Sequence, residues 1–477
     1  MKPFVTTEVD LLAGDAQTHL SRRRFLQGSG AGLGGIALAS LLERDGLAAS
    51  GVPAPFQVLA PRARSVIFFH MTGAPSQLDL FDDKPVLRKY DRQLAPKELF
   101  EGKRFSFLRG HPKLLGSRYQ FIPHGQSGVQ LSELLPHLGS VADDLCVVKS
   151  MRTTEFNHGP AQLCMHTGLN RQGNPSLGSW ATYGLGSECD NLPGYVVFLG
   201  GNTPGAGASL WKAGYLPSVY QGVQLRGEGD PVLYLNTPAG VNRADRRRTL
   251  DRIAALNQAN WEVVGDPEIQ TRIEQYEMAF RMQASVPELV DLSDEKAETL
   301  ASYGRGEFAE QCLKARRLVE RGVRFVEFFK GDWDTHGGQH QRLTQLCGEV
   351  DRPIAALIRD LKQRGLLDQT LVVWSAEFGR TPMLQGTEAP DKCGRDHQKD
   401  AFTVWMAGGG VRGGLSYGST NELGNEVAEN PVQVRDLHAT MLHLLGIDHR
   451  RLTYRYQGFD QRLTGVEPAR VVTDWLA

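Results

Sequence analysis

The sequence predicts an α/β protein built on a mostly parallel, doubly wound sheet with helices on both faces. Short runs rich in β-branched and aromatic residues recur along the chain, and stretches with helical spacing of apolar residues separate them. Acidic residues and histidines follow the ends of several of these runs. Because ligands of open α/β sheets bind beyond the carboxyl ends of the strands, we expect a functional site at that edge.

The composition limits the class of protein. The chain has 477 residues, a formal net charge of −1 and 41% hydrophobic residues, which suits one large α/β domain or two ordinary ones. A general nucleic-acid binder would usually carry a basic excess, so no nucleic-acid partner is expected. The six cysteines form no Cys-x-x-Cys pair, which argues against a zinc ribbon, while one or two disulfides stay compatible with an oxidising compartment.

The N-terminus predicts export. Residues 21–26, Ser-Arg-Arg-Arg-Phe-Leu, precede a mild apolar run over 28–42, and this pattern resembles a twin-arginine signal peptide spanning residues 1–50. The run is short and Gly-rich, so no stable membrane span is expected. A basic amphipathic helix is the alternative. We expect the twin-arginine export machinery as a partner and a periplasmic or extracellular location.

The predicted elements follow in order after a linker at 51–64. The main domain covers 65–465, with a helical insertion at about 240–321 and a C-terminal tail at 466–477. Within it, composition and spacing predict strands over 65–70, 145–149, 192–199, 323–329, 370–375 and 401–406, and helices over 131–138 (with Ser132 as N-cap), 245–282, 292–321, 339–364 and 433–445.

The strand predicted over 323–329 leads into the most informative loop. Asp332, Asp334 and His336 follow it before Gly337 and Gly338. Carboxylate oxygens and imidazole nitrogens at this spacing can reach one divalent metal ion. The alternative is a polar turn whose acids cap the next helix.

Other strand ends carry similar side chains. His70, Asp79 and Asp82 follow the first strand, although turn chemistry ahead of Lys84 and Pro85 explains the two acids equally well. Thr154 lies between a strand and a helix, where a hydroxyl either caps the helix or reacts at its positive end. Further candidates of these kinds are Asn157, His158, Glu377, Arg380, Arg395, Asp396 and His397.

Together these motifs resemble domain-of-unknown-function family 1501, a group of exported bacterial proteins, over nearly all of the mature chain. The matching segments are His70 to Asp82, Asn157-His158-Gly159, Asp334 to Gly338, Glu377 to Pro382, Gly394 to His397 and Gly408 to Gly414. That family in turn resembles the alkaline phosphatase and sulfatase superfamily.

The superfamily resemblance implies roles for individual residues. Asp332 and His336 match its Asp-x-x-x-His metal pair, and His397 resembles its later metal-binding histidine. Thr154 matches a nucleophile and Asn157 a residue that steadies the transferred group. The implied metal ligands are Asp332, Asp334, His336, Glu377 and His397, with Arg380 or Arg395 clamping anionic oxygens and His70, Asp79, Asp82, His158 and Asp396 as possible ligands or supporting residues.

Three departures limit what the resemblance implies. Met71-Thr72-Gly73 stands where the superfamily has an Asp-Gly ligand, and Glu377-Phe378 replaces its Asp-His pair. The formylglycine motif Cys-x-Pro-x-Arg does not occur, which excludes a sulfatase of that type. We therefore expect an exported hydrolase of phosphate or sulfate esters that uses zinc, calcium or manganese and acts on an anionic ester or glycan. The alternative is a catalytically degenerate member that binds sulfated or phosphorylated glycans.

Overall fold

The computed structural model describes residues 56 and 58–477, apart from 228, 233–234, 238–239 and 390. The predicted signal peptide lies outside the described residues. Contacts separate residues 1–53 from a unit over 54–477, and everything below concerns that second unit. No helix among the described residues has the length and apolar character needed to cross a bilayer.

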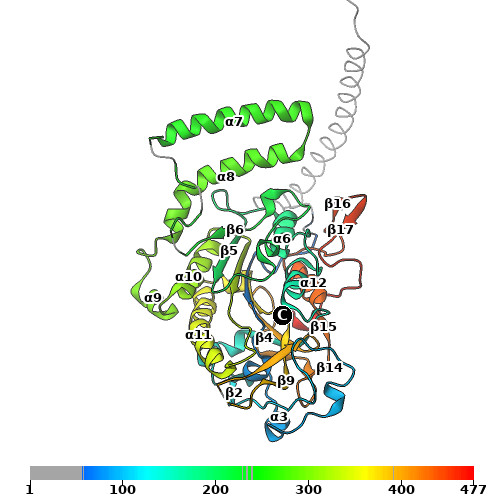
Figure 1. Ribbon diagram of the computed structural model, residues 1–477. Helices are drawn as coiled ribbons and strands as arrows, with labels where there is room; N and C mark the ends of the chain where they lie inside the picture. The colour runs from blue at the N-terminus through cyan, green and yellow to red at the C-terminus, as the bar shows by residue number, and fades with distance from the viewer. Residues whose placement is uncertain (1–55, 57, 228, 233–234, 238–239, 390) are drawn as a thin grey trace, which may run out of the picture. The chain divides into compact units, whose positions relative to one another are not determined.

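A nine-stranded, mostly parallel sheet forms the centre of the unit (Figure 1). Its main order is β12-β4-β11-β8-β1-β7-β5-β6, and β15 pairs with β4. Only β11 runs antiparallel to its neighbours. These strands are β1 (Ser65–Met71), β4 (Leu145–Arg152), β5 (Tyr195–Gly200), β6 (Val223–Leu225), β7 (Phe325–Lys330), β8 (Thr370–Ser375), β11 (Phe402–Ala407), β12 (Leu415–Tyr417) and β15 (Val432–Gln433).

Helices cover both faces of this sheet, as predicted. Alternate residues of β1 point to opposite faces: Phe69 packs in one core with α10 and α11, and Phe68 in a second core with α6 and α12. The longer helices are α5 (His158–Thr167), α6 (Leu177–Leu185), α7 (Arg243–Val264), α8 (Pro267–Val290), α9 (Ala297–Tyr303), α10 (Glu307–Glu320), α11 (Gln339–Gln363) and α12 (Val434–Leu444); the short ones are α2 (Gln77–Leu80), α3 (Pro85–Lys89) and α4 (Pro136–Gly139).

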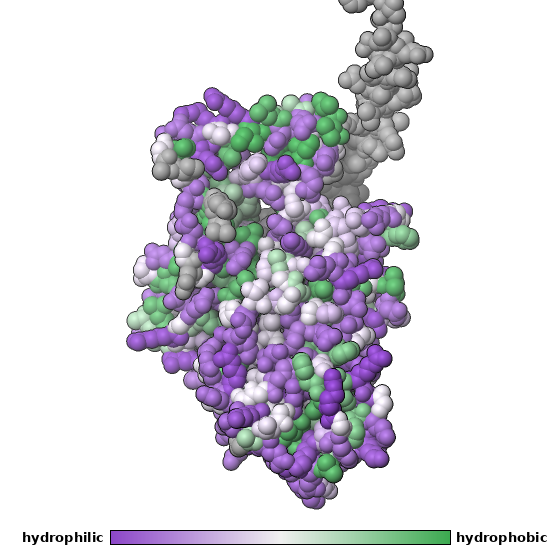
Figure 2. Space-filling view, in the orientation of Figure 1, coloured by the Kyte–Doolittle hydropathy of each residue, from purple (hydrophilic) through white to green (hydrophobic). Residues whose placement is uncertain are grey.

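The helical insertion consists of separate helices. Gly265, in the left-handed region with φ +69°, ends α7, and Asp266 then caps α8, so the stretch predicted as helical over 245–282 contains two helices. Arg247 of α7 and Glu277 of α8 form an ion pair, which holds the two helices side by side (Figure 1). Exposed polar side chains cover much of this pair (Figure 2).

Two local predictions were wrong. Residues 129–132 form β3 (Val129–Ser132), paired with β2 (Phe121–His124), and only α4 is helical in the predicted helix 131–138. Helix α4 begins at Pro136, and Leu135 is its N-cap residue, so Ser132 does not cap it. Residues 379–398, for which the sequence predicted no strand or helix, form the hairpin β9 (Gly379–Gly386) and β10 (Cys393–Gln398). Two further strand pairs are β13 (Ser419–Thr420) with β14 (Val427–Glu429), and β16 (Tyr454–Tyr456) with β17 (Phe459–Gln461).

No disulfide joins the six cysteines, all of which lie among the described residues, and five of them are buried. Burial raises the pKa of the Cys146 thiol to about 12 and raises that of Cys312 well above its usual value. The sixth, Cys164, is partly exposed, and its pKa is also raised by burial.

Candidate metal centre

Four side chains converge beyond the carboxyl ends of the parallel strands. The ligating atoms of His158, Asp334, His336 and His397 all lie within 4.8 Å of one another, a group that we call the His/Asp cluster. His158 follows β4, Asp334 and His336 follow β7, and His397 comes from β10 of the added hairpin. The cluster therefore occupies the edge at which ligands of open α/β sheets bind.

Each imidazole of the cluster is oriented by a fixed partner on its Nδ1 atom. His158 Nδ1 lies 2.7 Å from Glu377 Oε1, His336 Nδ1 lies 2.6 Å from Gln385 Oε1, and His397 Nδ1 lies 2.8 Å from the Phe156 carbonyl. These partners accept hydrogen bonds, so each neutral ring carries its proton on Nδ1. All three Nε2 lone pairs are thereby directed into the cluster.

The Nε2 atoms meet at one carboxylate oxygen. Asp334 Oδ1 lies 2.9 Å from His336 Nε2, 3.2 Å from His158 Nε2 and 3.5 Å from His397 Nε2. His336 Nε2 and His397 Nε2 are 3.0 Å apart, and the buried Nε2 of His158 has no well-aligned hydrogen-bond partner. Donor atoms that face one another in this way need shared positive charge, which either protons on the rings or a metal ion can supply. The donor set therefore fits a divalent metal ion.

Charge in the cluster is distributed unevenly. Burial opposes ionisation of Asp334, but the three histidines, which donate to it through Nε2 when their rings are protonated, and the charge of Arg380 hold its pKa well below the usual range. Burial lowers the pKa of His158, yet its contacts with Asp334 and Glu377 outweigh this and raise the pKa to about 9. A metal ion binding here must displace that proton.

Glu377 lies behind the cluster rather than in it. It is fully buried, and its Oε1 also accepts hydrogen bonds from Gly73 N (2.9 Å) and Gln162 Nε2 (3.0 Å). Its Oε2 lies 3.4 Å from Nε2 of the buried His70. Despite its burial, contacts with His158 and His70 keep the pKa of Glu377 well below its usual value. Glu377 thus orients a cluster ligand, and His70 supports Glu377.

Close backbone packing sets the position of Asp334. Gly73 has φ +108°, and a Cβ there would lie 2.4 Å from the Asp334 amide nitrogen. Arg380, itself fully buried, donates from Nη2 to Asp334 Oδ1 (2.6 Å) and from Nε to the Ala74 carbonyl (2.8 Å). Arg380 therefore joins the β1 loop to the β7 loop, and its guanidinium is occupied in doing so.

Four further candidates serve the surrounding structure. Asp332 pairs with Arg342 (3.1 Å) outside the cluster, and Asp82 pairs with Lys84 (3.1 Å). Asp79 and Arg395 form a two-pronged buried ion pair, with Nε to Oδ2 at 2.8 Å and Nη2 to Oδ1 at 3.3 Å.

Asp396 holds a loop over the cluster. Its Oδ2 accepts from the Phe107 and Leu108 amides at 2.7 and 2.8 Å. The loop over residues 100–110, which we call the strap, places the Phe107 ring 4.5 Å from that of His336. Ser106 Oγ lies 3.1 Å from His397 Nδ1. Sequence reasoning missed the strap, because nothing in its composition distinguishes it from an ordinary surface loop.

Thr154 and Asn157 are near the cluster in sequence but not in its contacts. Thr154 is exposed, and the contact described for its Oγ1 is with Glu155 (3.2 Å). It lines a separate hollow of about 230 Å³ together with Thr153, Cys164 and residues around α12. Asn157 is exposed at the start of α5, and its side chain makes no capping hydrogen bond.

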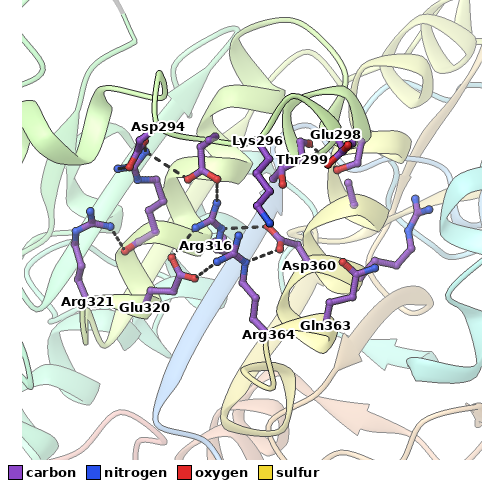
Figure 3. Close-up of a pocket in the computed structure, with 15 residues that line it drawn as sticks. Asp294, Lys296, Glu298, Thr299, Arg316, Glu320, Arg321, Asp360, Gln363 and Arg364 are labelled. Atoms are coloured by element: carbon purple, nitrogen blue, oxygen red, sulfur yellow. Dashed lines mark hydrogen bonds and ion pairs between the residues drawn. The ribbon is translucent and has the colours of Figure 1, made fainter.

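A hollow of about 790 Å³ lies elsewhere, between α9, α10 and α11 (Figure 3). Its charges pair with one another: Arg316 contacts Glu295 (2.6 Å) and Glu320 (2.6 Å), and Asp360 contacts Arg364 (2.6 Å). Arg316 also contacts Asp360 at 3.1 Å, and this ion pair joins α10 to α11. None of the predicted site residues lines this hollow.

The protein belongs to the class of α/β proteins with a mostly parallel sheet. A candidate histidine–aspartate metal site lies at the carboxyl edge of that sheet. The family model described as "Protein of unknown function (DUF1501)" matches residues 63–476, and the chain belongs to this family. The family prediction is thereby confirmed.

Solved structures that resemble the chain include sulfatases and alkaline phosphatases. The PsFucS1 sulfatase from Pseudoalteromonas sp. is 11% identical, with a TM-score of 0.36, 82% of this chain covered and 68% of that chain. Alkaline phosphatase from the Antarctic bacterium TAB5 is 10% identical, with a TM-score of 0.29, 73% of this chain covered and 92% of that one. The lipoteichoic acid synthase LtaP from Listeria monocytogenes is 10% identical, with a TM-score of 0.33, 90% of this chain covered and 80% of that one. No curated protein matches.

Proposed function

We propose that the protein is an exported, metal-dependent hydrolase of phosphate or sulfate esters. The observation that carries this proposal is the convergence of three Nε2 lone pairs on Asp334 Oδ1. His158, Asp334, His336 and His397 would hold the ion. A divalent ion there would polarise a non-bridging ester oxygen and lower the pKa of a nucleophile beside it.

The donor set favours zinc over calcium. Three imidazole nitrogens and one carboxylate oxygen are typical zinc ligands, whereas calcium takes six to eight oxygen ligands. Manganese also accepts carboxylate and imidazole ligands, so it is the second candidate.

The chain's own residues supply positioning and access. Glu377, Gln385 and the Phe156 carbonyl fix the three imidazoles, and Arg380 fixes Asp334. The Asp334 carboxylate is 43% exposed, so a substrate can reach the cluster from solvent. The Phe107 ring shields the His336 side of the cluster from water.

The nucleophile is proposed from the sequence motif, and Thr154 is its candidate. Thr154→Ala should abolish turnover of aryl phosphate or sulfate esters if this hydroxyl attacks. Unchanged turnover would remove Thr154 from the mechanism and leave water as the nucleophile.

Metal analysis of the purified mature protein is the first test. We expect about one zinc or manganese ion per chain, lost in His336→Ala and retained in the matched control His340→Ala, whose ring contacts Tyr119 outside the cluster. A panel of aryl esters then tests catalysis. Folded wild-type and His340→Ala proteins that both lack metal would contradict the proposal. Bound metal without turnover of any ester would favour the glycan-binding alternative.

A further inference from the structure

A third hollow, lined mostly by residues of the strap, lies beside the His/Asp cluster. It has a volume of about 420 Å³. Two of its lining residues also support the cluster: the Phe156 carbonyl accepts from His397 Nδ1 at 2.8 Å, and the Leu108 amide donates to Asp396 at 2.8 Å. The two spaces therefore share a wall.

The charges that line this hollow all have the same sign. Lys103, Arg104 and Arg109 line it, and no carboxylate does. The hollow of Figure 3 is different, since there acids and bases line the same space and pair with one another. A hollow with cations alone attracts anions and concentrates them near the cluster.

The three cationic side chains differ in the contacts that they already make within the protein. Arg109 donates to carbonyls of its own loop, at 2.8 Å for Leu108 and 3.3 Å for Ser106, and so shapes the strap. Lys103 pairs with the exposed Glu426, which lies outside the lining. Among the described contacts, none engages the exposed guanidinium of Arg104. Arg104 therefore offers free donors to a ligand.

Aromatic rings complete the lining. Phe100, Phe105 and Phe156 stand beside the three cations. Rings of this kind pack against the apolar face of a sugar or another carbon skeleton, while guanidinium and ammonium groups bind its phosphate or sulfate groups. The lining thus suits an anion that also carries apolar surface.

We propose that this hollow binds a second anionic group of the substrate, one unit beyond the ester at the His/Asp cluster. The substrate would then be a polyanionic oligomer, phosphorylated or sulfated at successive units, rather than a simple monoester. This inference rests on the proposed function, because it assigns the cluster the ester that is cleaved. The strap would then select substrates by their length and their negative charge.

Binding to the chelator-treated full chain tests the hollow without catalysis. Tripolyphosphate is the probe, titrated by calorimetry into wild type, Lys103→Gln/Arg104→Gln and the control Arg450→Gln/Arg451→Gln, whose side chains are exposed and line neither space. We expect roughly tenfold weaker binding in the first variant, wild-type binding in the control, and loss of the difference at high salt. Equal affinity in all three proteins, or no binding to wild type, would overturn the proposal.

Turnover distinguishes this inference from the proposed function. With metal bound, the Lys103→Gln/Arg104→Gln variant should show a higher KM and an unchanged kcat for an oligomeric substrate that carries three phosphate or sulfate groups. For an aryl monoester, its KM and kcat should both equal those of wild type. Equal KM changes for both substrates would contradict a separate subsite. One outcome separates the two proposals. If no ester turns over, but tripolyphosphate still binds the chelator-treated variant more weakly than the chelator-treated wild type, the hydrolase proposal fails and the anion-binding hollow stands. Circular dichroism checks the fold of each variant, and the charge-reversed Lys103→Glu/Arg104→Glu protein should bind still more weakly.

Discussion

Glu377 Oε1 accepts a hydrogen bond from His158 Nδ1 at 2.7 Å, and this contact turns the other nitrogen of the ring toward Asp334. A buried carboxylate therefore orients a cluster ligand that belongs to a different loop. Such supporting carboxylates fix both the tautomer and the orientation of metal-binding histidines. The Glu377–His158 pair is the most direct place to test the geometry.

Glu377→Gln should weaken metal binding by about 10- to 100-fold, the usual effect of losing a carboxylate behind a metal-binding histidine. The amide keeps the shape and one acceptor but loses the negative charge. Competition with a chromophoric chelator measures the affinity. Glu349→Gln, which removes a surface ion pair with Lys330, is the control and should bind as wild type does. Equal affinities in the two variants would refute the orienting role.

Gly73→Ala should displace Asp334 of the His/Asp cluster through a steric clash, in addition to the strain that a positive φ imposes on alanine. The added Cβ would lie 2.4 Å from the Asp334 amide nitrogen, so the β1 loop or the β7 loop must move. Gly173→Ala is the matched control, because Gly173 also has positive φ (+96°) but nothing within 4 Å of its Cβ position. Both variants should lose about 1 kcal/mol of unfolding free energy from strain. Only Gly73→Ala should also lose metal affinity, and wild-type affinity in that variant would count against the close approach.

Asp79→Asn should destabilise the fold while leaving the cluster's metal affinity unchanged. The substitution leaves the buried Arg395 guanidinium without its carboxylate, a loss that typically costs about 3–5 kcal/mol. Urea denaturation measures it. Asp83→Asn, which breaks the more exposed pair with Arg88, should cost at most about 1 kcal/mol. A stable Asp79→Asn protein that has lost its metal would instead make Asp79 a ligand.

Glu327→Gln should change how stability depends on pH. Burial raises the pKa of Glu327 to about 8, so the folded protein holds a proton there that the unfolded chain releases above about 4.5. This contribution to stability is therefore lost as pH rises toward 8. Its neighbour His166, with a pKa lowered to about 3 by burial, opposes the trend only below about 6.5.

The informative window for this variant lies between about pH 6.5 and 8. Wild type should lose up to about 1.4 kcal/mol per pH unit there relative to Glu327→Gln, since the amide can keep both hydrogen bonds without titrating. Unfolding free energies at several pH values, compared between the two proteins, measure the difference. Parallel pH profiles would show that Glu327 is ionised in the folded state.

The strand ends could be predicted because local sequence carries the information. The run Phe325–Lys330 is rich in aromatic and apolar residues, and the position of Asp334 and His336 beyond it follows from the parallel sheet. The hairpin β9–β10 could not be predicted, since its glycines and charges read as loop. Long-range pairing stabilises it: Arg395 with Asp79, and Arg380 with Asp334.

Distinguishing ligands from supporting residues also required tertiary information. The superfamily resemblance implied Glu377 as a ligand and left His158 as a ligand or a supporting residue, and the structure places His158 in the cluster with Glu377 behind it. Which of two neighbouring side chains belongs to the His/Asp cluster depends on how helix α5 meets the loop after β8, and neither segment specifies the other. The strap over His397 depends in the same way on Asp396 accepting from two amides about 290 residues earlier in the chain.

The burial of the thiols has a practical consequence. A thiol whose pKa is raised to about 12, as for Cys146, carries almost no thiolate at neutral pH, and thiolate is the form that attacks disulfides and oxidants. In the folded chain, Cys146 and the equally buried Cys312 should therefore resist oxidants that attack exposed thiols. Unfolding would expose both side chains to cross-linking, so the fold itself protects these two thiols from redox damage.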